Sequence, residues 1–132
     1  MDMVRITRVI SLLTVASGVA AIAMPKALAD FVGLAFETGS ASGYGEIGAV
    51  YGGNFIALGA IGLYAARATV AAGSALLTAV GVVWLSIASG RLAVILLTAV
   101  GPVGVMSWVW LAMETAAGLC FVVAARGGGA AS

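Results

Sequence analysis

The sequence predicts an all-α integral membrane protein, built as a four-helix antiparallel bundle, and three observations lead to this fold class. Of the 132 residues, 63% are hydrophobic and only 8% are charged, whereas a soluble domain carries about 25% charged residues. The mean hydropathy is +1.19, so the chain has more apolar surface than a water-soluble fold of this length can bury. Its apolar runs are long enough to cross a bilayer, and polar or glycine-rich connectors separate them.

The polar composition excludes several kinds of functional site. The chain has no His and a single cysteine, Cys120, which excludes an internal disulfide, a His/Cys zinc site and a His-dependent catalytic triad. Six basic and five acidic residues give a net charge of +1, so nothing indicates a nucleic-acid partner. We therefore expect no catalytic residue, no metal, no cofactor and no enzymatic activity. Cys120 stands in an apolar segment and is expected to serve packing alone.

The first expected span covers residues 6–24, with Arg5 and Arg8 at its start, where long basic side chains can extend to the lipid headgroups. A cleaved signal peptide is the alternative, because residues 27–29 (Ala-Leu-Ala) resemble a cleavage site. We expect a retained span. The outer loop then covers residues 25–45. Pro25 opens within it either a short helix at the membrane interface or an ordered loop, and the pattern favours neither.

The second expected span, residues 46–66, is the segment around which the chain is organised. Its residues 47–66 carry no charge and have the length of one crossing. The third span is expected at 71–97, and the fourth at 102–125, where Pro102 is well placed to open a helix. Residues 1–126 then form one domain, and the glycine-rich residues 127–132 form a disordered tail.

The basic residues predict the orientation of the spans. Two of them, Lys26 and Arg91, fall on the side of the outer loop, and four fall on the side of the termini: Arg5, Arg8, Arg67 and Arg126. By the positive-inside rule this distribution places both termini in the cytoplasm. We expect the membrane to be a bacterial inner membrane.

Three ionisable residues form an expected intramembrane polar cluster: Glu46, Arg91 and Glu114. A charge at the centre of a span costs about 2.5–3.5 kcal/mol on insertion scales, so each should face other helices and find a partner. Glu46 and Arg91 are expected at similar depth near the outer side. Glu114 is expected roughly 18 Å deep at ~1.5 Å per residue, where an inward-extended Arg91 can reach it. One arginine and two carboxylates favour a proton on one carboxyl.

Other residues of the spans are candidates for contacts between helices. Three polar side chains are expected to add hydrogen bonds between helices or, less often, to contact a ligand: Tyr51, Asn54 and Ser86. Gly48 and Gly52 form one row of small residues, and Gly53 belongs to the next row. Small residues let helix backbones approach closely in lipid. We expect these glycines to pack within the chain, although a second copy is the alternative.

The segment YGGNFIALGAIGLY (51–64) preceded by Glu46, the Gly90-Arg91 pair and Glu114 together resemble a known family. This is the domain-of-unknown-function family 4345, small bacterial four-span membrane proteins with DoxX-like relatives. The resemblance covers nearly the whole chain and implies a four-helix membrane bundle with no established reaction. The DoxX-like relatives are linked to oxidoreductase or quinone-associated systems, but this sequence has no redox residue that carries this link over.

Three functional hypotheses follow. The first is a non-enzymatic structural or accessory membrane component whose partners are the lipid bilayer and a homo-oligomer or larger membrane complex. The second is a transporter or a proton or small-molecule pathway that uses Glu46, Arg91 and Glu114, which would need an oligomer because four spans are few. The third is a quinone- or lipid-binding subunit of a membrane oxidoreductase. In the first hypothesis the charged cluster only fixes the register of the helices.

Overall fold

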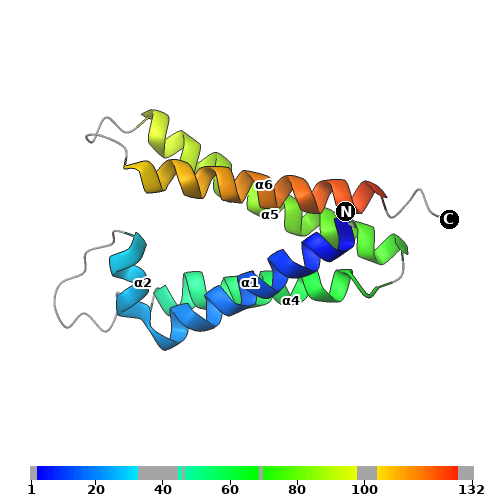
Figure 1. Cartoon of the computed structure of the whole chain (residues 1–132), viewed down its shortest axis with the longest axis horizontal. Helices are drawn as coiled ribbons and strands as arrows, with labels where there is room; N and C mark the ends of the chain where they lie inside the picture. Colours follow the sequence, from blue (N-terminus) through cyan, green and yellow to red (C-terminus); the bar gives the residue numbers. More distant parts are fainter. Residues whose placement is uncertain (1–2, 33–44, 46, 69, 98–103, 128–132) are drawn as a thin grey trace. The chain divides into compact units, whose positions relative to one another are not determined.

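The computed structural model of the chain describes residues 3–32, 45, 47–68, 70–97 and 104–127. Within these ranges every element is helical (Figure 1), and the predicted all-α bundle class is confirmed. Four helical segments are long and apolar enough to cross a membrane: Met3–Ala23, Ile47–Ala65, Ala71–Leu97 and Val105–Gly127. Length and composition thus identify a multi-pass membrane protein. The segments lie close to the expected spans at 6–24, 46–66, 71–97 and 102–125.

The chain divides into two compact units, residues 8–63 and residues 1–7 with 64–132. The first unit holds most of α1 (Met3–Ala23), followed by α2 (Pro25–Val32), η1 (Ile47–Gly53) and most of α4 (Asn54–Ala65). In this unit α1 lies along the span formed by η1 and α4 (Figure 1). Gly18 packs against Gly52 and Ile56, and Gly59 packs against Ser11, so the two helices run antiparallel.

Helix α2 resolves the alternatives left open for the segment that Pro25 opens, since residues 25–32 are helical. Pro25 occupies the first helical position, where its fixed φ suits a helix and its missing N–H is no loss. Lys26 and Asp30, one helical turn apart, form an exposed ion pair of 2.7 Å between Nζ and Oδ2. On the other face Ala29 is buried, and α2 contacts η1. An apolar face and a charged face fit a helix at the membrane interface.

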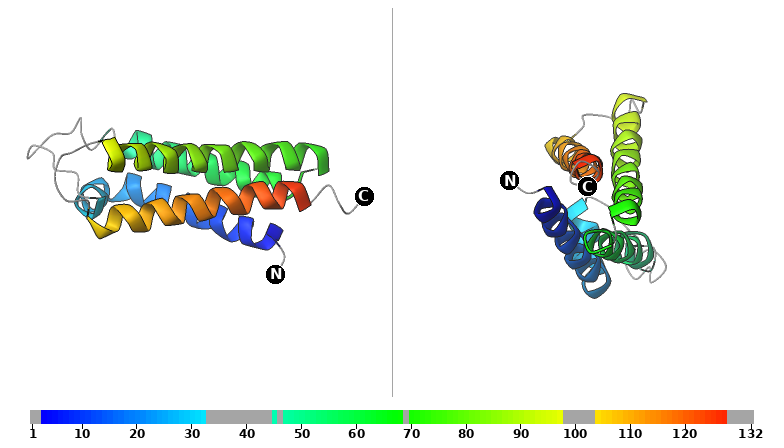
Figure 2. Two further views of the ribbon diagram at one scale, coloured as in Figure 1. Left: turned by 90° about the horizontal axis from the view of Figure 1, so that it is seen from above. Right: turned by 90° about the vertical axis from the view of Figure 1, so that its right-hand side faces the viewer.

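The second unit is dominated by a hairpin of two long helices, α5 (Val70–Leu97) and α6 (Val105–Gly127). They lie side by side over most of their length (Figures 1 and 2). Near one end the Ser74 hydroxyl donates a 2.9 Å hydrogen bond to the carbonyl of Ala125. Near the other end Arg91 pairs with Glu114. These two contacts fix an antiparallel register.

The second span begins with a seven-residue π-helix, η1, and continues as the α-helix α4. A π-helix bonds each carbonyl to an N–H five residues on, so its turn is wider than an α-helical turn. Such segments are rare and often occur at functional sites. The consequence here is that residues three apart in Ile47–Gly53 are rotated further from each other than they would be in an α-helix.

Candidate functional site

The candidate site is a charged pair held between α5 and α6, and glycines bring these two helices together. A Cβ on Gly81 would stand 3.0 Å from the carbonyl oxygen of Gly118, and one on Gly118 would stand 3.1 Å from that of Gly81. No larger residue fits at either position without moving a backbone. Leu85 fills the space beside Gly118, with Cγ at 2.7 Å from the same hypothetical Cβ. Because the backbones of α5 and α6 come this close, side chains further along the hairpin can contact each other between the two helices.

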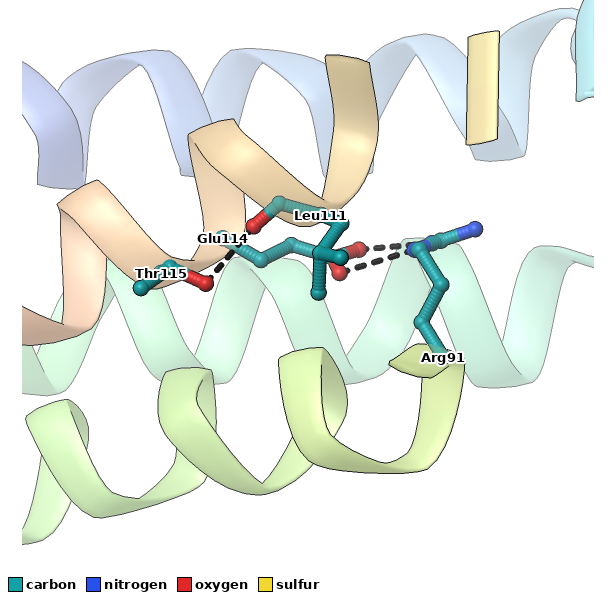
Figure 3. Close-up of polar contacts among 4 residues, drawn as sticks. All are labelled: Arg91, Leu111, Glu114 and Thr115. Atoms are coloured by element: carbon teal, nitrogen blue, oxygen red, sulfur yellow. Dashed lines mark hydrogen bonds and ion pairs between the residues drawn. The ribbon is translucent and has the colours of Figure 1, made fainter. Parts of the chain in front are cut away.

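Arg91 on α5 and Glu114 on α6 form a side-on ion pair with two hydrogen bonds (Figure 3). The Arg91 Nε donates to Oε2 of Glu114 at 2.8 Å, and Nη2 donates to Oε1 at 2.6 Å. Both carboxylate oxygens are therefore used by one guanidinium. Two parallel N–H···O bonds between charged groups are stronger and more directional than a single contact.

Burial differs between the two partners. The Glu114 side chain is 7% exposed, whereas that of Arg91 is 32% exposed. A carboxylate removed from water in this way is costly unless its charge is compensated. The guanidinium supplies both the opposite charge and the two donors. The pair therefore makes Glu114 tolerable inside the hairpin and ties the two helices at one register.

The helix bounds explain why the two side chains meet. Arg91 lies roughly 9 Å from the end of α5 at Leu97, taking ~1.5 Å per residue. Glu114 lies roughly 14 Å from the start of α6 at Val105 on the same basis. This distance is shorter than the roughly 18 Å counted from residue 102, because α6 begins at Val105. The long side chain of Arg91 spans the difference between the distances of the two residues from their helix ends.

The other member of the expected cluster, Glu46, lies outside the described residues, and so does its expected pairing with Arg91. Ser86 does not add to the pair, because its hydroxyl donates to the carbonyl of Val82 in its own helix at 2.8 Å. Thr115, next to Glu114, likewise donates to Leu111 (Figure 3). In the described part of α5 and α6, the bidentate pair is thus built from Arg91 and Glu114.

Tyr51 and Asn54 belong to the other unit. The Tyr51 ring meets the Phe55 ring edge to face, with centroids 6.0 Å apart and an interplanar angle of 76°. This contact joins η1 to the first turn of α4 and is worth on the order of 1 kcal/mol beyond the area that it buries. The Asn54 side chain is exposed at the start of α4.

The three glycines expected to pack within the chain have different surroundings. A Cβ on Gly52 would meet the side chain of Ile22 and, at 3.3 Å, the carbonyl of Gly18, so Gly52 faces α1. A Cβ on Gly48 or on Gly53 would have nothing within 4 Å. Gly52 therefore packs on α1, and Gly48 does not share that contact.

Sequence reasoning missed the small residues that do pack. In the first unit these are Gly18 and Gly59, and in the hairpin Gly81 and Gly118. The sequence did contain a signal, which is a spacing of seven residues between Ser11 and Gly18 and again between Gly52 and Gly59. Residues seven apart lie on the same face of a helix, two turns apart, so both can contact one neighbouring helix. Ser11 is fully buried at this crossing, and its hydroxyl has no hydrogen-bond partner among the described residues.

Comparison with family models, with curated proteins and with solved structures gives no match for the chain. Within the residues that the structure describes, no group of three or more His, Cys, Asp or Glu side chains could hold a metal ion. The chemistry of the candidate site is therefore that of the Arg91–Glu114 pair: a fixed positive group, a fixed negative group and two hydrogen bonds between them.

Proposed function

We propose that the protein is a non-enzymatic structural or accessory component of a membrane, in which the Arg91–Glu114 pair holds a helix hairpin at one register. The single observation that carries the proposal is the bidentate bond, in which both oxygens of the buried Glu114 carboxylate accept from one guanidinium. Two parallel charge-assisted bonds to one guanidinium give the contact a defined geometry, which suits an ion pair that fixes the register of two helices.

The packing of the hairpin supports the same proposal. Gly81 and Gly118 bring the helix backbones into contact, and Ser74 bonds Ala125 near the far end. The polar contacts between α5 and α6 thus lie at both ends of a close backbone approach. In lipid, where no hydrophobic force joins helices, small residues and polar contacts of this kind drive association.

The proposal extends to location and family. We place the protein in a bacterial inner membrane with both termini in the cytoplasm, on the distribution of Arg5, Arg8, Arg67 and Arg126 against Lys26 and Arg91. We also place it with the small four-span family and its DoxX-like relatives, on the residues quoted for that resemblance. Its partners are then lipid and other membrane proteins.

The test is purification of the tagged full chain with its native lipid, followed by identification of the proteins that remain bound. The matched variant is Arg91→Gln with Glu114→Gln, which removes both charges and leaves side chains that can still hydrogen-bond. The proposal expects a membrane protein partner in stoichiometric amount, retained by the double variant once it is folded. Proton flux into vesicles that hold the purified chain should equal that of empty vesicles.

Two outcomes would count against this function. Proton flux that the wild type shows and the folded double variant lacks would make the pair part of a pathway. Loss of the bound partner in a folded double variant would make the charges a recognition element instead. Either result would replace the structural role with a functional one for Arg91 and Glu114.

A further inference from the structure

The ends of α4 and α6 both pack against the first residues of α5. A Cβ on Gly73 would stand 2.7 Å from the carbonyl oxygen of Ala65, so the last residue of α4 lies against this part of α5. The next residue, Ser74, donates its hydroxyl to the carbonyl of Ala125 at 2.9 Å, and Figure 1 shows the start of α5 and the end of α6 at the same end of the hairpin. All four residues belong to one compact unit, so these contacts do not depend on where residues 8–63 lie.

Two arginines directly follow these contacts in the sequence. Arg67 comes two residues after Ala65, and Arg126 is the residue after Ala125. Arg67 stands in the connection between the second and third candidate spans, and Arg126 is the last residue but one of the fourth. The spans alone therefore bring both side chains to headgroup depth on the same side of the membrane, where a guanidinium contacts phosphates and water.

This side of the membrane is rich in positive charge and poor in carboxylates. It carries four arginines, and among the five acidic residues only Asp2, which lies outside the described residues, precedes the first span or follows the last. The carboxylate of Glu114 lies inside α6 and accepts two bonds from Arg91. The other three acidic residues stand between the first and second spans: Asp30, Glu37 and Glu46. The chain therefore does not balance its charge here, and a negative partner from outside it is favoured.

Backbone carbonyls at these helix ends are bonded by the chain itself. The N–H groups of residues 67 and 68 donate to the carbonyl of Tyr64 at 2.9 and 3.0 Å. The carbonyl of Ala125 accepts the Ser74 hydroxyl. These bonds satisfy carbonyls of the last turns of α4 and α6, whose partial negative charge would otherwise weaken the attraction of an anion to this end.

We propose that Arg67 and Arg126 together bind the phosphate of a net-anionic phospholipid in the leaflet on the side of the termini. A guanidinium offers a planar fork of N–H donors that matches two phosphate oxygens, and two such forks at adjoining helix ends suit one headgroup. Clusters of basic residues at the ends of membrane helices recognise anionic headgroups in this way. A zwitterionic headgroup fits less well, because its ammonium would lie beside two positive charges.

A lipid fits better than an acidic segment of another protein, because both arginines stand at the depth where a leaflet presents its phosphates. The inference names the lipid class and the residues of one contact. It does not use the Arg91–Glu114 pair, which lies further along the hairpin. Failure of this proposal would therefore leave the function proposed for that pair standing, and the reverse also holds.

The test is native mass spectrometry of the purified full chain in detergent, titrated with phosphatidylglycerol or with phosphatidylcholine. We expect the wild type to bind phosphatidylglycerol more tightly. Arg67→Gln and Arg126→Gln should each weaken that binding about fivefold, the factor that corresponds to about 1 kcal/mol per basic residue. Binding of phosphatidylcholine should stay the same, which separates loss of the site from loss of the fold.

Three further variants define the site. Arg8→Gln makes the same change of charge on the same side of the membrane, and Lys26→Gln makes it in the outer loop. Both should retain most of the preference for phosphatidylglycerol. The double variant Arg67→Lys with Arg126→Lys keeps both charges and should bind more tightly than the corresponding double glutamine variant, because lysine also binds phosphate as a point charge.

Free phosphate is the other source of the same chemistry, and a competition experiment distinguishes the two. Added salt should weaken the binding of phosphatidylglycerol by screening, and inorganic phosphate should weaken it no more than sodium chloride of equal ionic strength. A larger effect of phosphate would overturn the assignment to a lipid. Equal binding of the two lipids by the wild type would overturn the site. So would a loss in Arg8→Gln as large as that in Arg67→Gln, because the attraction would then be a diffuse property of this side of the protein.

Discussion

Arg91 Nη2 and Glu114 Oε1 lie 2.6 Å apart, and the parallel bond from Nε to Oε2 is 2.8 Å long. Removing one partner strands the other, and breaking a buried pair from one side costs about 3–5 kcal/mol. We expect Arg91→Gln and Glu114→Gln each to lower the free energy of unfolding by an amount near the low end of that range. The double variant should lose less than the sum, with a coupling of about 1–3 kcal/mol.

Unfolding of all four proteins by a denaturing detergent in mixed micelles measures this coupling. Ser89→Ala is the control for the method, since that hydroxyl bonds only its own helix. Strictly additive losses for Arg91 and Glu114 would contradict the bidentate pair.

Lysine should not replace Arg91. A lysine retains the charge but offers a single ammonium, which cannot make two parallel bonds to one carboxylate. We expect Arg91→Lys to cost about 1–2 kcal/mol, between wild type and Arg91→Gln. The same unfolding measurement checks this, and stability equal to wild type would show that charge alone holds the pair.

Gly59→Ala should destabilise the contact of α1 with α4, because its Cβ would stand 2.6 Å from the carbonyl oxygen of Ser11 and 2.9 Å from the amide nitrogen of Val15. Backbone atoms cannot move aside locally, so the helices must separate. We expect a loss of about 1–3 kcal/mol, the usual cost of overpacking.

Gly48→Ala is the matched substitution in the same span, because its Cβ meets nothing within 4 Å. It should be neutral or slightly stabilising, since alanine is the better helix former by about 1 kcal/mol. Thermal midpoints of the two variants in the same detergent make the comparison. Equal midpoints would mean that Gly59 does not lie against α1.

Ser11→Ala should stabilise the protein. The Ser11 hydroxyl is fully buried and lacks a hydrogen-bond partner among the described residues, and a buried unsatisfied group costs about 1–3 kcal/mol. We expect a gain of about 1 kcal/mol in the free energy of unfolding. Thr14→Ala, which removes a hydroxyl bonded to Ile10, should give no gain. A destabilised Ser11→Ala would show that this hydroxyl has a partner.

Both termini should lie in the cytoplasm. A reporter fused after Ser132 and one inserted within residues 37–43 should report opposite sides of the membrane, because four basic residues flank one side and two the other. Activity of a periplasmic reporter at Ser132 would reverse the orientation or change the number of crossings.

Much of the fold could be predicted from the sequence because apolar length is a strong signal. A run of about twenty apolar residues has one plausible structure in lipid, a helix that satisfies its own backbone. The described helices accordingly lie close to the expected spans. The π-helix could not be predicted, since its bonding pattern differs from that of an α-helix by one residue and leaves no periodic mark on Ile47–Gly53.

The candidate site was only partly predictable for a related reason. Depth along a span can be counted from the sequence, and it put two carboxylates, Glu46 and Glu114, within reach of Arg91. Which carboxylate faces the guanidinium depends on the rotation of each helix. For α6 that rotation is set by the contact of Gly81 with Gly118, a packing detail that no count of residues contains. The pairing of Glu46 stays a prediction.

The mutual approach of Gly81 and Gly118 also has a consequence for how the hairpin responds to heat. Ordering a long side chain on folding costs as much as about 1.5–2 kcal/mol of conformational entropy, whereas glycine has no side-chain rotamers to lose. The closest part of the α5–α6 contact is thus formed by residues that lose no side-chain entropy when the helices pack. Heating should therefore loosen the long side chains of Arg91 and Glu114 first, while the glycine crossing keeps the two helices together.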